Sequence, residues 1–355
     1  MQHPLDNPKL IKRLDSRNVL PSVEQFSSQC RDAWREATTI SLPAAYRKVS
    51  NIVLVGMGGS ALGAHVVKTA IPLRIPMAIV NDYRLPDYAG KNTLVVLSSY
   101  SGTTEEVLSA AQEAQEKKAK ILVIATGGAL ADFAKKNHAP IYRFTPLHNP
   151  CGQPRLGAGY TLIGLLAILK TLGLARISGN EVKDAIAGID IFAEKLGPAT
   201  PFTENPAKQL AKTLEKKIIF IAASEHLVGS AHIMANQINE TGKQFAAYFP
   251  LPEMNHHLLE GLTFPKELKK YAHFLFLESD LYHPRTQKRY PLTQEVVRKQ
   301  GFSASSWHRS TPSRISQALE AIAFSGFMTF YLSLLNDIDP SEIPWVEYFK
   351  KKMAS

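Results

Sequence analysis

The sequence contains little cysteine. Cys30 and Cys151 are the only two cysteines in a chain of 355 residues. Two cysteines cannot form the dense disulfide framework that small secreted domains use in place of a large core. This scarcity fits a protein of a reducing compartment, and we expect a cytoplasmic location.

Long apolar runs and an apolar leader are also missing. A helix that spans a bilayer needs about 18 or more largely apolar residues, and no stretch of this sequence reads as such a segment. The opening MQHPLDNPKLIKRLD carries charges of both signs and has no apolar h-region. We therefore expect neither a secretory signal nor a membrane partner.

Charged residues make up only 20% of the chain, whereas 45% of its residues are hydrophobic. This balance excludes a disordered chain, and the length is sufficient for two domains. The formal net charge is +10, with much of the excess late in the chain, in HPRTQKRYPLTQEVVRKQ and EYFKKKMAS. Such a charge is compatible with nucleic-acid binding, with a solvated basic surface or with steering of a small anionic substrate. We find neither an aromatic RNA-binding motif nor a convincing helix-turn-helix, and we expect no nucleic-acid partner.

What the sequence does contain is an alternation of short apolar strands and helical segments. Residues 1–50 read as helices interrupted at NVLPS and SLPAA. The segments NIVLVG, MAIVND, TLVVLSS and ILVIAT then read as strands, and SALGAHVVKTA and TEEVLSAAQEAQEKK read as helices between them. Continuous apolar strands that alternate with helices predict an α/β fold, a flavodoxin-like doubly wound parallel sheet flanked by helices.

A proline-rich polar segment, FTPLHNPCGQP at residues 144–154, precedes a second round of the same pattern. A long apolar helix through GYTLIGLLAILKTLGLA comes first, then strands at KIIFIAA, QFAAYF and HFLFLES, and finally a helix around ISQALEAIAFSGFMTFYLSLL. The stretch IFIAASEHLVGSAHIMA faintly echoes VLVGMGGSALGAHVVK. We predict two similar domains, residues 1–150 with an N-terminal helical segment and residues 151–355 with the C-terminal helices.

A glycine turn lies at VGMGGSALG, residues 55–63, between a strand and a helix. Gly56, Gly58 and Ala61 fit the loose dinucleotide pattern G-x-G-x-x-G/A, and Asp82 follows at the end of the next strand. A nicotinamide-dependent dehydrogenase is one interpretation. The other is that the glycines only let the helix pack closely on the sheet.

A hydroxyl turn lies at SSYSGTT, residues 98–104, where five of seven residues are serine or threonine. Phosphate oxygens accept hydrogen bonds from hydroxyls and from the free N–H groups of a helix N-terminus, where the helix dipole also favours negative charge. Gly102 lets the backbone turn tightly around such an anion. Ordinary capping of the following helix by Ser101 or Thr103 is the alternative, but a cap accounts for one hydroxyl only. The pattern favours a site for a phosphate monoester.

These motifs together resemble a known family. GMGGSA followed by SSYSGTTEE is similar to a sugar isomerase (SIS) domain. PRLGAGY at 154–160, NQINETGK at 236–243 and PEMNHHLLEG at 252–261 narrow the resemblance to the bifunctional phosphoglucose/phosphomannose isomerases. The resemblance runs from about residue 45 to the end. It implies two SIS domains in a homodimer without cofactor or metal, which interconverts glucose 6-phosphate, or mannose 6-phosphate, with fructose 6-phosphate through a cis-enediol.

The resemblance also implies roles for individual residues. Glu240 matches the base that transfers the proton, Arg155 the group that stabilises the enediolate, and His256 and Lys350 the pair assigned to ring opening. It implies that His256 crosses from the partner subunit. The expected phosphate ligands and the glycine that lines the sugar are Ser60, Ser99, Ser101, Thr104 and Gly59. The family commonly has asparagine after the histidine, where this chain has His257.

The chemistry suits these residue types. A buried carboxylate with a raised pKa can move a proton between carbons 1 and 2, arginine supplies a fixed positive donor, and histidine can protonate a ring oxygen. Each candidate has a plain alternative: Glu240 as a surface helix glutamate, Arg155 as a linker ion pair and Lys350 as part of a solvated tail. His256 and His257 could be a surface pair, and His232 reads as a packed or exposed histidine. No H-E-x-x-H spacing of a zinc enzyme is present.

Two other functions remain open at this point. A sugar-phosphate sensor would bind phosphate without turnover, and a dehydrogenase would bind a nicotinamide cofactor but would leave the hydroxyl turn unexplained. An amidotransferase-type amino-sugar synthase is disfavoured because no N-terminal cysteine nucleophile is present.

Overall fold

The apolar runs of the first half of the chain become the five strands of one parallel sheet. In this computed structural model, which describes residues 3–353, they are β1 (Asn51–Val55), β2 (Met77–Val80), β3 (Thr93–Ser99), β4 (Lys120–Ala125) and β5 (Ile141–Arg143). The strand order is β2-β1-β3-β4-β5, and every neighbouring pair is parallel. This is the flavodoxin-like order, so the predicted doubly wound fold is confirmed for this half.

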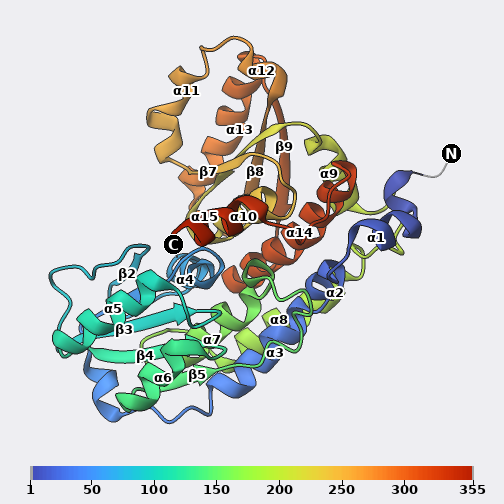
Figure 1. Ribbon diagram of the computed structural model, residues 1–355. Coiled ribbons are helices and arrows are strands. Elements are labelled where there is room, and N and C mark those ends of the chain that lie inside the picture. Colours follow the sequence, from blue (N-terminus) through green and yellow to red (C-terminus); the bar gives the residue numbers. More distant parts are fainter. Residues whose placement is uncertain (1–2, 354–355) are drawn as a thin grey trace.

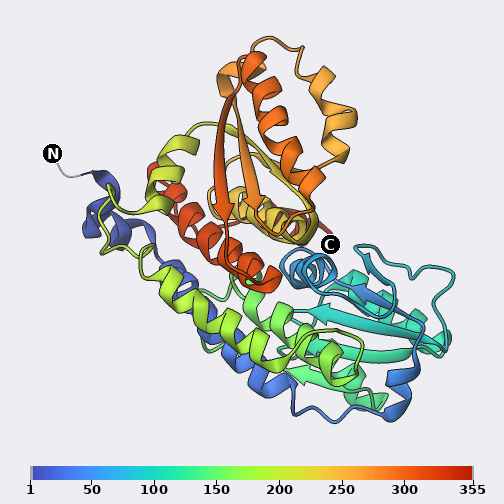
Figure 2. The ribbon, with the colours of Figure 1, turned by 180° about the vertical axis from the view of Figure 1, so that it is seen from behind.

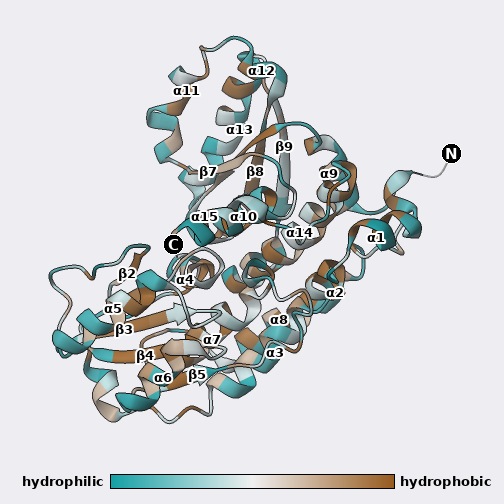
Figure 3. Ribbon diagram, in the orientation of Figure 1, coloured by the Kyte–Doolittle hydropathy of each residue, from teal (hydrophilic) through white to brown (hydrophobic). Residues whose placement is uncertain are grey.

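Helices cover both faces of this sheet. Successive strand residues point to opposite faces, and they belong to two different hydrophobic clusters, with Ile52, Leu54, Leu94 and Val96 in one and Val53, Val55, Val95 and Leu97 in the other. Helices α5 (Glu105–Glu116) and α6 (Gly128–Lys136) complete the second cluster. Helix α4 (Gly59–Ala70) completes the first. Burial on both faces explains why the strands are continuously apolar, as the brown colour of β3 and β4 in Figure 3 shows.

Helix α7 (Ala158–Thr171), almost entirely buried, packs against α3 (Phe26–Ala37) and α4. Together with α8 (Gly179–Ala193), it shares the hydrophobic cluster of the first sheet. Figure 2 shows α3, α7 and α8 running side by side on one face of that sheet. The domain division at residue 150 stays a prediction. In space, the first sheet is covered by helices that precede residue 150 in the chain and by helices that follow it.

The second half of the chain forms a four-stranded parallel sheet of order β7-β6-β8-β9. Its strands are β6 (Ile218–Ala223), β7 (Ala246–Pro250), β8 (Ala272–Ser279) and β9 (Ser303–Arg309). The first three were predicted. Strand β9 was missed because it is an edge strand with mostly polar, partly exposed residues. Around this sheet lie α9 (Pro206–Leu214), α10 (Val228–Glu240), α11 (Leu258–Gly261), α12 (Leu268–Tyr271) and α13 (Pro284–Lys299) (Figure 1).

Helix α14 (Arg314–Leu335) runs through the middle of the molecule and contacts α8, α9 and α10. Within residues 3–353 it is the one helix that is long and apolar enough to cross a membrane, with a mean hydropathy of 1.5. The expectation that no segment would reach this length and hydropathy was therefore wrong. Because 94% of its most apolar window is buried inside the protein, α14 is a core helix.

The N-terminal region is helical, as predicted, with α1 (Pro8–Leu14), α2 (Val19–Glu24) and α3. The predicted break at NVLPS was wrong, because α2 begins inside it. Pro21 lies in the first turn of α2, where a backbone N–H has no intrahelical partner and proline is tolerated. The break at SLPAA is confirmed by a loop at 41–43. The remaining elements are α15 (Pro344–Met353) and the 3₁₀ helices η1 (Pro4–Asp6), η2 (Ala44–Lys48), η3 (Pro154–Leu156), η4 (Glu225–Leu227) and η5 (Glu253–His256).

Candidate active site

The hydroxyl turn follows β3 at the carboxyl edge of the first sheet. Its conformation depends on Gly102, whose φ of +72° is in the left-handed region. A Cβ at this position would lie 1.8 Å from the carbonyl oxygen of Gly127. The amide of Leu130 donates to the carbonyl of Gly102 over 2.9 Å, so the start of α6 holds the turn in place.

The hydroxyls of this turn bond to one another rather than cap α5. Ser99 Oγ lies 2.7 Å from Thr104 Oγ1, and Ser101 Oγ lies 2.9 Å from Thr103 Oγ1. Thr104 occupies the N-cap position, but its side chain makes no capping hydrogen bond. The first-turn amides of α5 therefore receive no side-chain cap from Thr104, and a cluster of hydroxyls directly precedes them in the chain. This is the arrangement that a phosphate site needs.

The glycine turn is tied directly to the hydroxyl turn. Ser60 Oγ accepts a hydrogen bond from the amide of Tyr100 over 2.8 Å, and Ser98 Oγ donates to the carbonyl of Ser60 over 2.8 Å. Gly56 packs against the same strand, since a Cβ there would lie 3.0 Å from the carbonyl oxygen of Ser98. Close helix–sheet packing thus accounts for this glycine without a dinucleotide.

Gly59 brings a third segment to the same place. It is the first residue of α4, and a Cβ on it would lie 2.7 Å from the carbonyl carbon of Pro154 and 2.8 Å from the amide nitrogen of Arg155. Only glycine allows this approach. The backbone that carries Arg155 therefore lies directly against the glycine turn.

Arg155 is buried, with only 1% of its surface exposed. Its Nε donates to Thr241 Oγ1 over 3.0 Å, its Nη1 to Gln153 Oε1 over 2.8 Å, and its Nη2 to the carbonyl of Pro340 over 2.8 Å. Burial lowers its pKa, and the charge of Glu240 opposes that shift. A guanidinium held on three sides is a fixed positive group, as the predicted role requires.

Glu240 is the last residue of α10, and its Oε2 lies 3.7 Å from Nη1 of Arg155. Its side chain keeps 32% of its surface exposed, so it can reach a ligand. Burial raises its pKa above the usual range, against the opposing charges of Arg155, Lys243 and Lys350. The surface-glutamate interpretation does not describe this carboxylate.

Lys243 was missed as a candidate, although it stands in the NETGK motif. Its Nζ donates to the carbonyl of Glu240 and lies 3.5 Å from the carbonyl oxygen of Pro340. Burial lowers its pKa to about 8. The sequence signal was a lysine three residues after the candidate base, which alone does not distinguish a buried ammonium from a solvated one.

Lys350 lies on α15, where every described side chain is at least partly exposed. The tail is helical to Met353 rather than irregular, and the charge of Lys350 lowers the pKa of Glu240. The charges of Arg155 and Lys350 thus both act on Glu240, and the backbone of Arg155 lies beside Gly59.

His256 and His257 lie apart from this group. Both are exposed, at the end of η5 and just after it, and within residues 3–353 neither imidazole makes a hydrogen bond or an ion pair. His232 is a packed histidine, as expected, with its ring 4.6 Å from that of Tyr248 and 4.4 Å from that of His65. The Asp82 side chain is exposed and accepts from the amide of Tyr83.

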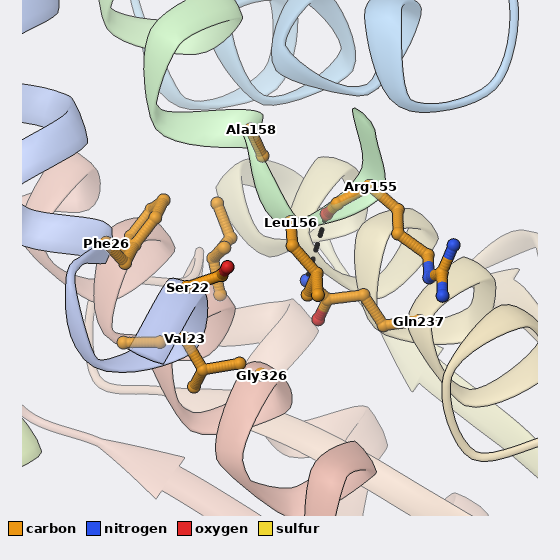
Figure 4. Close-up of a pocket in the computed structure, with 10 residues that line it drawn as sticks. Ser22, Val23, Phe26, Arg155, Leu156, Ala158, Gln237 and Gly326 are labelled. Atoms are coloured by element: carbon orange, nitrogen blue, oxygen red, sulfur yellow. Dashed lines mark hydrogen bonds between the residues drawn. The ribbon is translucent and has the colours of Figure 1, made fainter. Parts of the chain in front are cut away.

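A small internal cavity lies behind Arg155 (Figure 4). It is lined mainly by apolar side chains of α2, α3 and α14, and the guanidinium of Arg155 points away from it. The amide of Gln237 donates to the carbonyl of Arg155 over 3.4 Å at its edge. The candidate site is therefore on the opposite side of Arg155, toward Glu240.

Two family models match the chain. The SIS domain matches residues 45–149, and the bacterial phospho-glucose isomerase C-terminal SIS domain matches residues 203–353. Together they cover both parallel sheets. The two-SIS-domain architecture that the motifs predicted is thereby confirmed.

Curated relatives match over most of the chain. A bifunctional phosphoglucose/phosphomannose isomerase of Caldicellulosiruptor bescii is 30% identical over 95% of this chain and 99% of its own length. One of Thermoplasma acidophilum is 28% identical over 86% of this chain and 90% of its own length. A solved structure of a hypothetical protein from Thermus thermophilus superposes with a TM-score of 0.72 at 16% identity, covering 98% of this chain and 94% of that one. The last comparison supports the fold alone.

Proposed function

The chain belongs to the bifunctional phosphoglucose/phosphomannose isomerase family, and from this premise we propose that it interconverts glucose 6-phosphate and mannose 6-phosphate with fructose 6-phosphate. The proton would move between carbons 1 and 2 through a cis-enediol. The observation that carries this proposal is the pair formed by Glu240 and Arg155, a carboxylate with a raised pKa 3.7 Å from a buried guanidinium.

Each member of this pair has a separate task. An ionised Glu240 takes the proton from one carbon and returns it to the other, and its raised pKa makes it a better base than an ordinary glutamate. Arg155 stays charged and stabilises the negative oxygen of the enediolate. Since the other guanidinium nitrogens are held by Thr241 and the backbone carbonyl of Pro340, the group does not have to reorganise during the reaction.

The phosphate would be held at the junction of the two turns. We assign it to Ser60, Ser99, Ser101 and Thr104, with Gly59 against the sugar. The assignment is supported by the contact of Ser99 with Thr104, by the hydrogen bond from the Tyr100 amide to Ser60, and by the start of α5, which Thr104 does not cap and which favours an anion. Gly59 lies against the backbone of Arg155, which supports a substrate that extends from this site toward Arg155.

Ring opening would involve Lys350 and His256, the latter supplied by a second subunit. Two observations support this assignment. The side chain of His256 is exposed and makes no hydrogen bond within residues 3–353. Helix α15 exposes apolar side chains, with Trp345 at 82%, Phe349 at 63% and Tyr348 at 59% exposure, which a partner subunit would cover. We propose a homodimer in the cytoplasm, where its two buried cysteines stay reduced.

The proposal is tested by coupled assays with glucose 6-phosphate and with mannose 6-phosphate, each with and without EDTA. Turnover of both sugars that EDTA leaves unchanged is the expected result. Tight binding of hexose phosphates without turnover would instead indicate a sugar-phosphate sensor. Turnover that requires a nicotinamide would indicate a dehydrogenase.

A further inference from the structure

A side chain next to the candidate pair has not been assigned a role so far. Gln153 is buried, with 9% of its surface exposed, and its Oε1 accepts a hydrogen bond of 2.8 Å from Nη1 of Arg155. This is the same nitrogen that lies 3.7 Å from Oε2 of Glu240. One guanidinium nitrogen is thus placed between a neutral acceptor and the carboxylate.

The orientation of the Gln153 side-chain amide follows from the hydrogen-bonding properties of its partner. A guanidinium only donates, so the atom of Gln153 that faces it must be the carbonyl oxygen. The backbone of Gln153 is fixed as well. Its carbonyl accepts from Asn149 Nδ2 over 3.0 Å, and the same Nδ2 donates to the hydroxyl of Tyr100 over 2.8 Å. Asn149 is 2% exposed, and Tyr100 belongs to the hydroxyl turn.

We propose that Gln153 is a positioning residue for the isomerase reaction, which fixes Nη1 of Arg155 toward Glu240 and, through Asn149, ties this geometry to the hydroxyl turn. The inference rests on the proposed function, because it assigns Gln153 to the machinery of that reaction. Gln153 acts through Arg155 and is not itself assigned a contact with substrate.

A neutral acceptor is what this position requires. A carboxylate here would form an ion pair with Nη1 and compete with Glu240 for the charge of Arg155. An apolar side chain would leave Nη1 without its fixed acceptor, so the guanidinium could rotate. Glutamine orients the cation and leaves its charge available to Glu240 and to a negative oxygen on the substrate.

Three positive groups act on Glu240. They are Arg155, Lys243 in the turn after α10 and Lys350 on α15, and all three lower its pKa against the effect of burial. Asp339 and Glu342 act on Lys243 in turn. A new carboxylate at position 153 adds a negative charge to this set and raises the pKa of Glu240.

The test compares Gln153→Glu and Gln153→Met in the full-length protein. For Gln153→Glu, we expect the pKa of Glu240 to rise by roughly 1 pH unit. It is measured by ¹³C NMR titration of the carboxyl carbon, assigned by its disappearance in Glu240→Gln. The acid limb of the pH profile of kcat/KM should move up by the same amount, because the base must be ionised. For Gln153→Met, kcat should fall by up to about 100-fold with little change in KM.

Gln237→Met is the matched control. Gln237 is also buried, and it makes a hydrogen bond with Arg155 only at the backbone carbonyl, so this variant should keep the wild-type pKa of Glu240. If folded Gln153→Met keeps wild-type kcat, the proposal is wrong, whether or not Gln153→Glu folds. The NMR titration needs no turnover. An inactive wild type would therefore contradict the proposed function, and an unshifted Glu240 in Gln153→Glu would contradict the role of Gln153.

Discussion

Glu240 shows how a single residue acquires its properties from its surroundings. In the sequence it is one glutamate in a polar motif, NQINETGK. In the structure it ends α10 beside a buried arginine, and burial outweighs three positive charges in setting the direction of its pKa. Desolvation of a carboxylate disfavours its charged form, which makes Glu240 a stronger base when it does ionise.

Replacement of Glu240 by glutamine should abolish isomerisation, because the amide cannot accept the proton from carbon. Sugar-phosphate binding should remain largely intact, since the assigned phosphate ligands are untouched. Coupled assays and isothermal titration calorimetry with glucose 6-phosphate measure the two effects. Glu267→Gln, an exposed glutamate near α12, serves as the control and should keep full activity. Substantial turnover by pure Glu240→Gln would remove this residue from its role.

At the scale of elements, the hydroxyl turn between β3 and α5 carries three of the four residues that we assign to phosphate binding. The strand ends in a turn whose hydroxyls contact one another, and Gly102 allows the turn to pack against Gly127. A phosphate would replace these mutual hydrogen bonds with charge-assisted ones, which are stronger. A phosphate site in this turn would thus explain why so many serine and threonine residues occur there.

Substitution of Ser101 by alanine should weaken the binding of glucose 6-phosphate by roughly 1–3 kcal/mol, the value of a charge-assisted hydrogen bond. Calorimetry on the folded variant gives the change in Kd. Thr103→Ala, in the same turn but outside the assigned phosphate ligands, is the matched control and should have a smaller effect. Equal affinity of Ser101→Ala and the wild type would place the phosphate elsewhere.

At the scale of the whole molecule, α4 and α10 join the two sheets. Gly229 on α10 packs against the backbone of His65 on α4, where a Cβ would lie 2.6 Å from the carbonyl carbon. The rings of His65 and His232 meet edge to face in this contact. Within residues 3–353, Nε2 of His65 and Nδ1 of His232 are buried without a hydrogen-bond partner, and neither ring has a counter-ion that would stabilise its protonated form.

This contact should make stability depend on pH. Burial lowers the pKa of His65 to about 4, and neighbouring His232 and Lys68 add to that effect; burial also lowers the pKa of His232. The unfolded chain, with histidine at 6.5, therefore binds more protons than the fold as the pH falls from 6.5 toward 4, and the free energy of unfolding decreases. Urea unfolding at pH 7.5 and pH 5 measures this loss.

In His65→Phe, the difference in the free energy of unfolding between the two pH values should be smaller than in the wild type. Other buried histidines, such as His273, leave some of it in place. His257→Gln, which removes an exposed histidine, should retain the full difference. A His65→Phe variant with the wild-type difference would show that the interface histidine does not contribute.

The proposed dimer gives a second prediction at this scale. If His256 completes the site of the partner subunit, Glu240→Gln and His256→Asn are each inactive as homodimers, but a mixed dimer contains one site with both residues intact. Co-refolding of the two variants should therefore restore part of the activity in the coupled assay. Sedimentation velocity confirms that mixed dimers form. Dimers without restored activity would place His256 in the site of its own subunit.

The sequence by itself determined the fold class and the family. Continuous apolar strands followed by helices predict parallel sheets with buried faces, and glycine and hydroxyl clusters at strand ends mark the carboxyl edge of such a sheet. These signals are local, because strand propensity, turn conformation and helix termini depend on neighbouring residues. They identified both turns, whereas the resemblance to the isomerase family placed Glu240, Arg155 and Lys350 among the candidates. They also mistook the NVLPS segment, where a proline in a first helical turn resembles a break.

Only the tertiary structure decided which side chains meet. The pairing of Arg155 with Glu240, the burial of Lys243 and the placement of Gln153 all depend on α10 packing against α4 and on Gly59 admitting the backbone of Pro154. Residues far apart in the chain come within hydrogen-bond distance there, and burial then sets their pKa values. Exposure and pKa result from the atoms that surround a group, and those atoms come from distant segments that local sequence patterns do not specify.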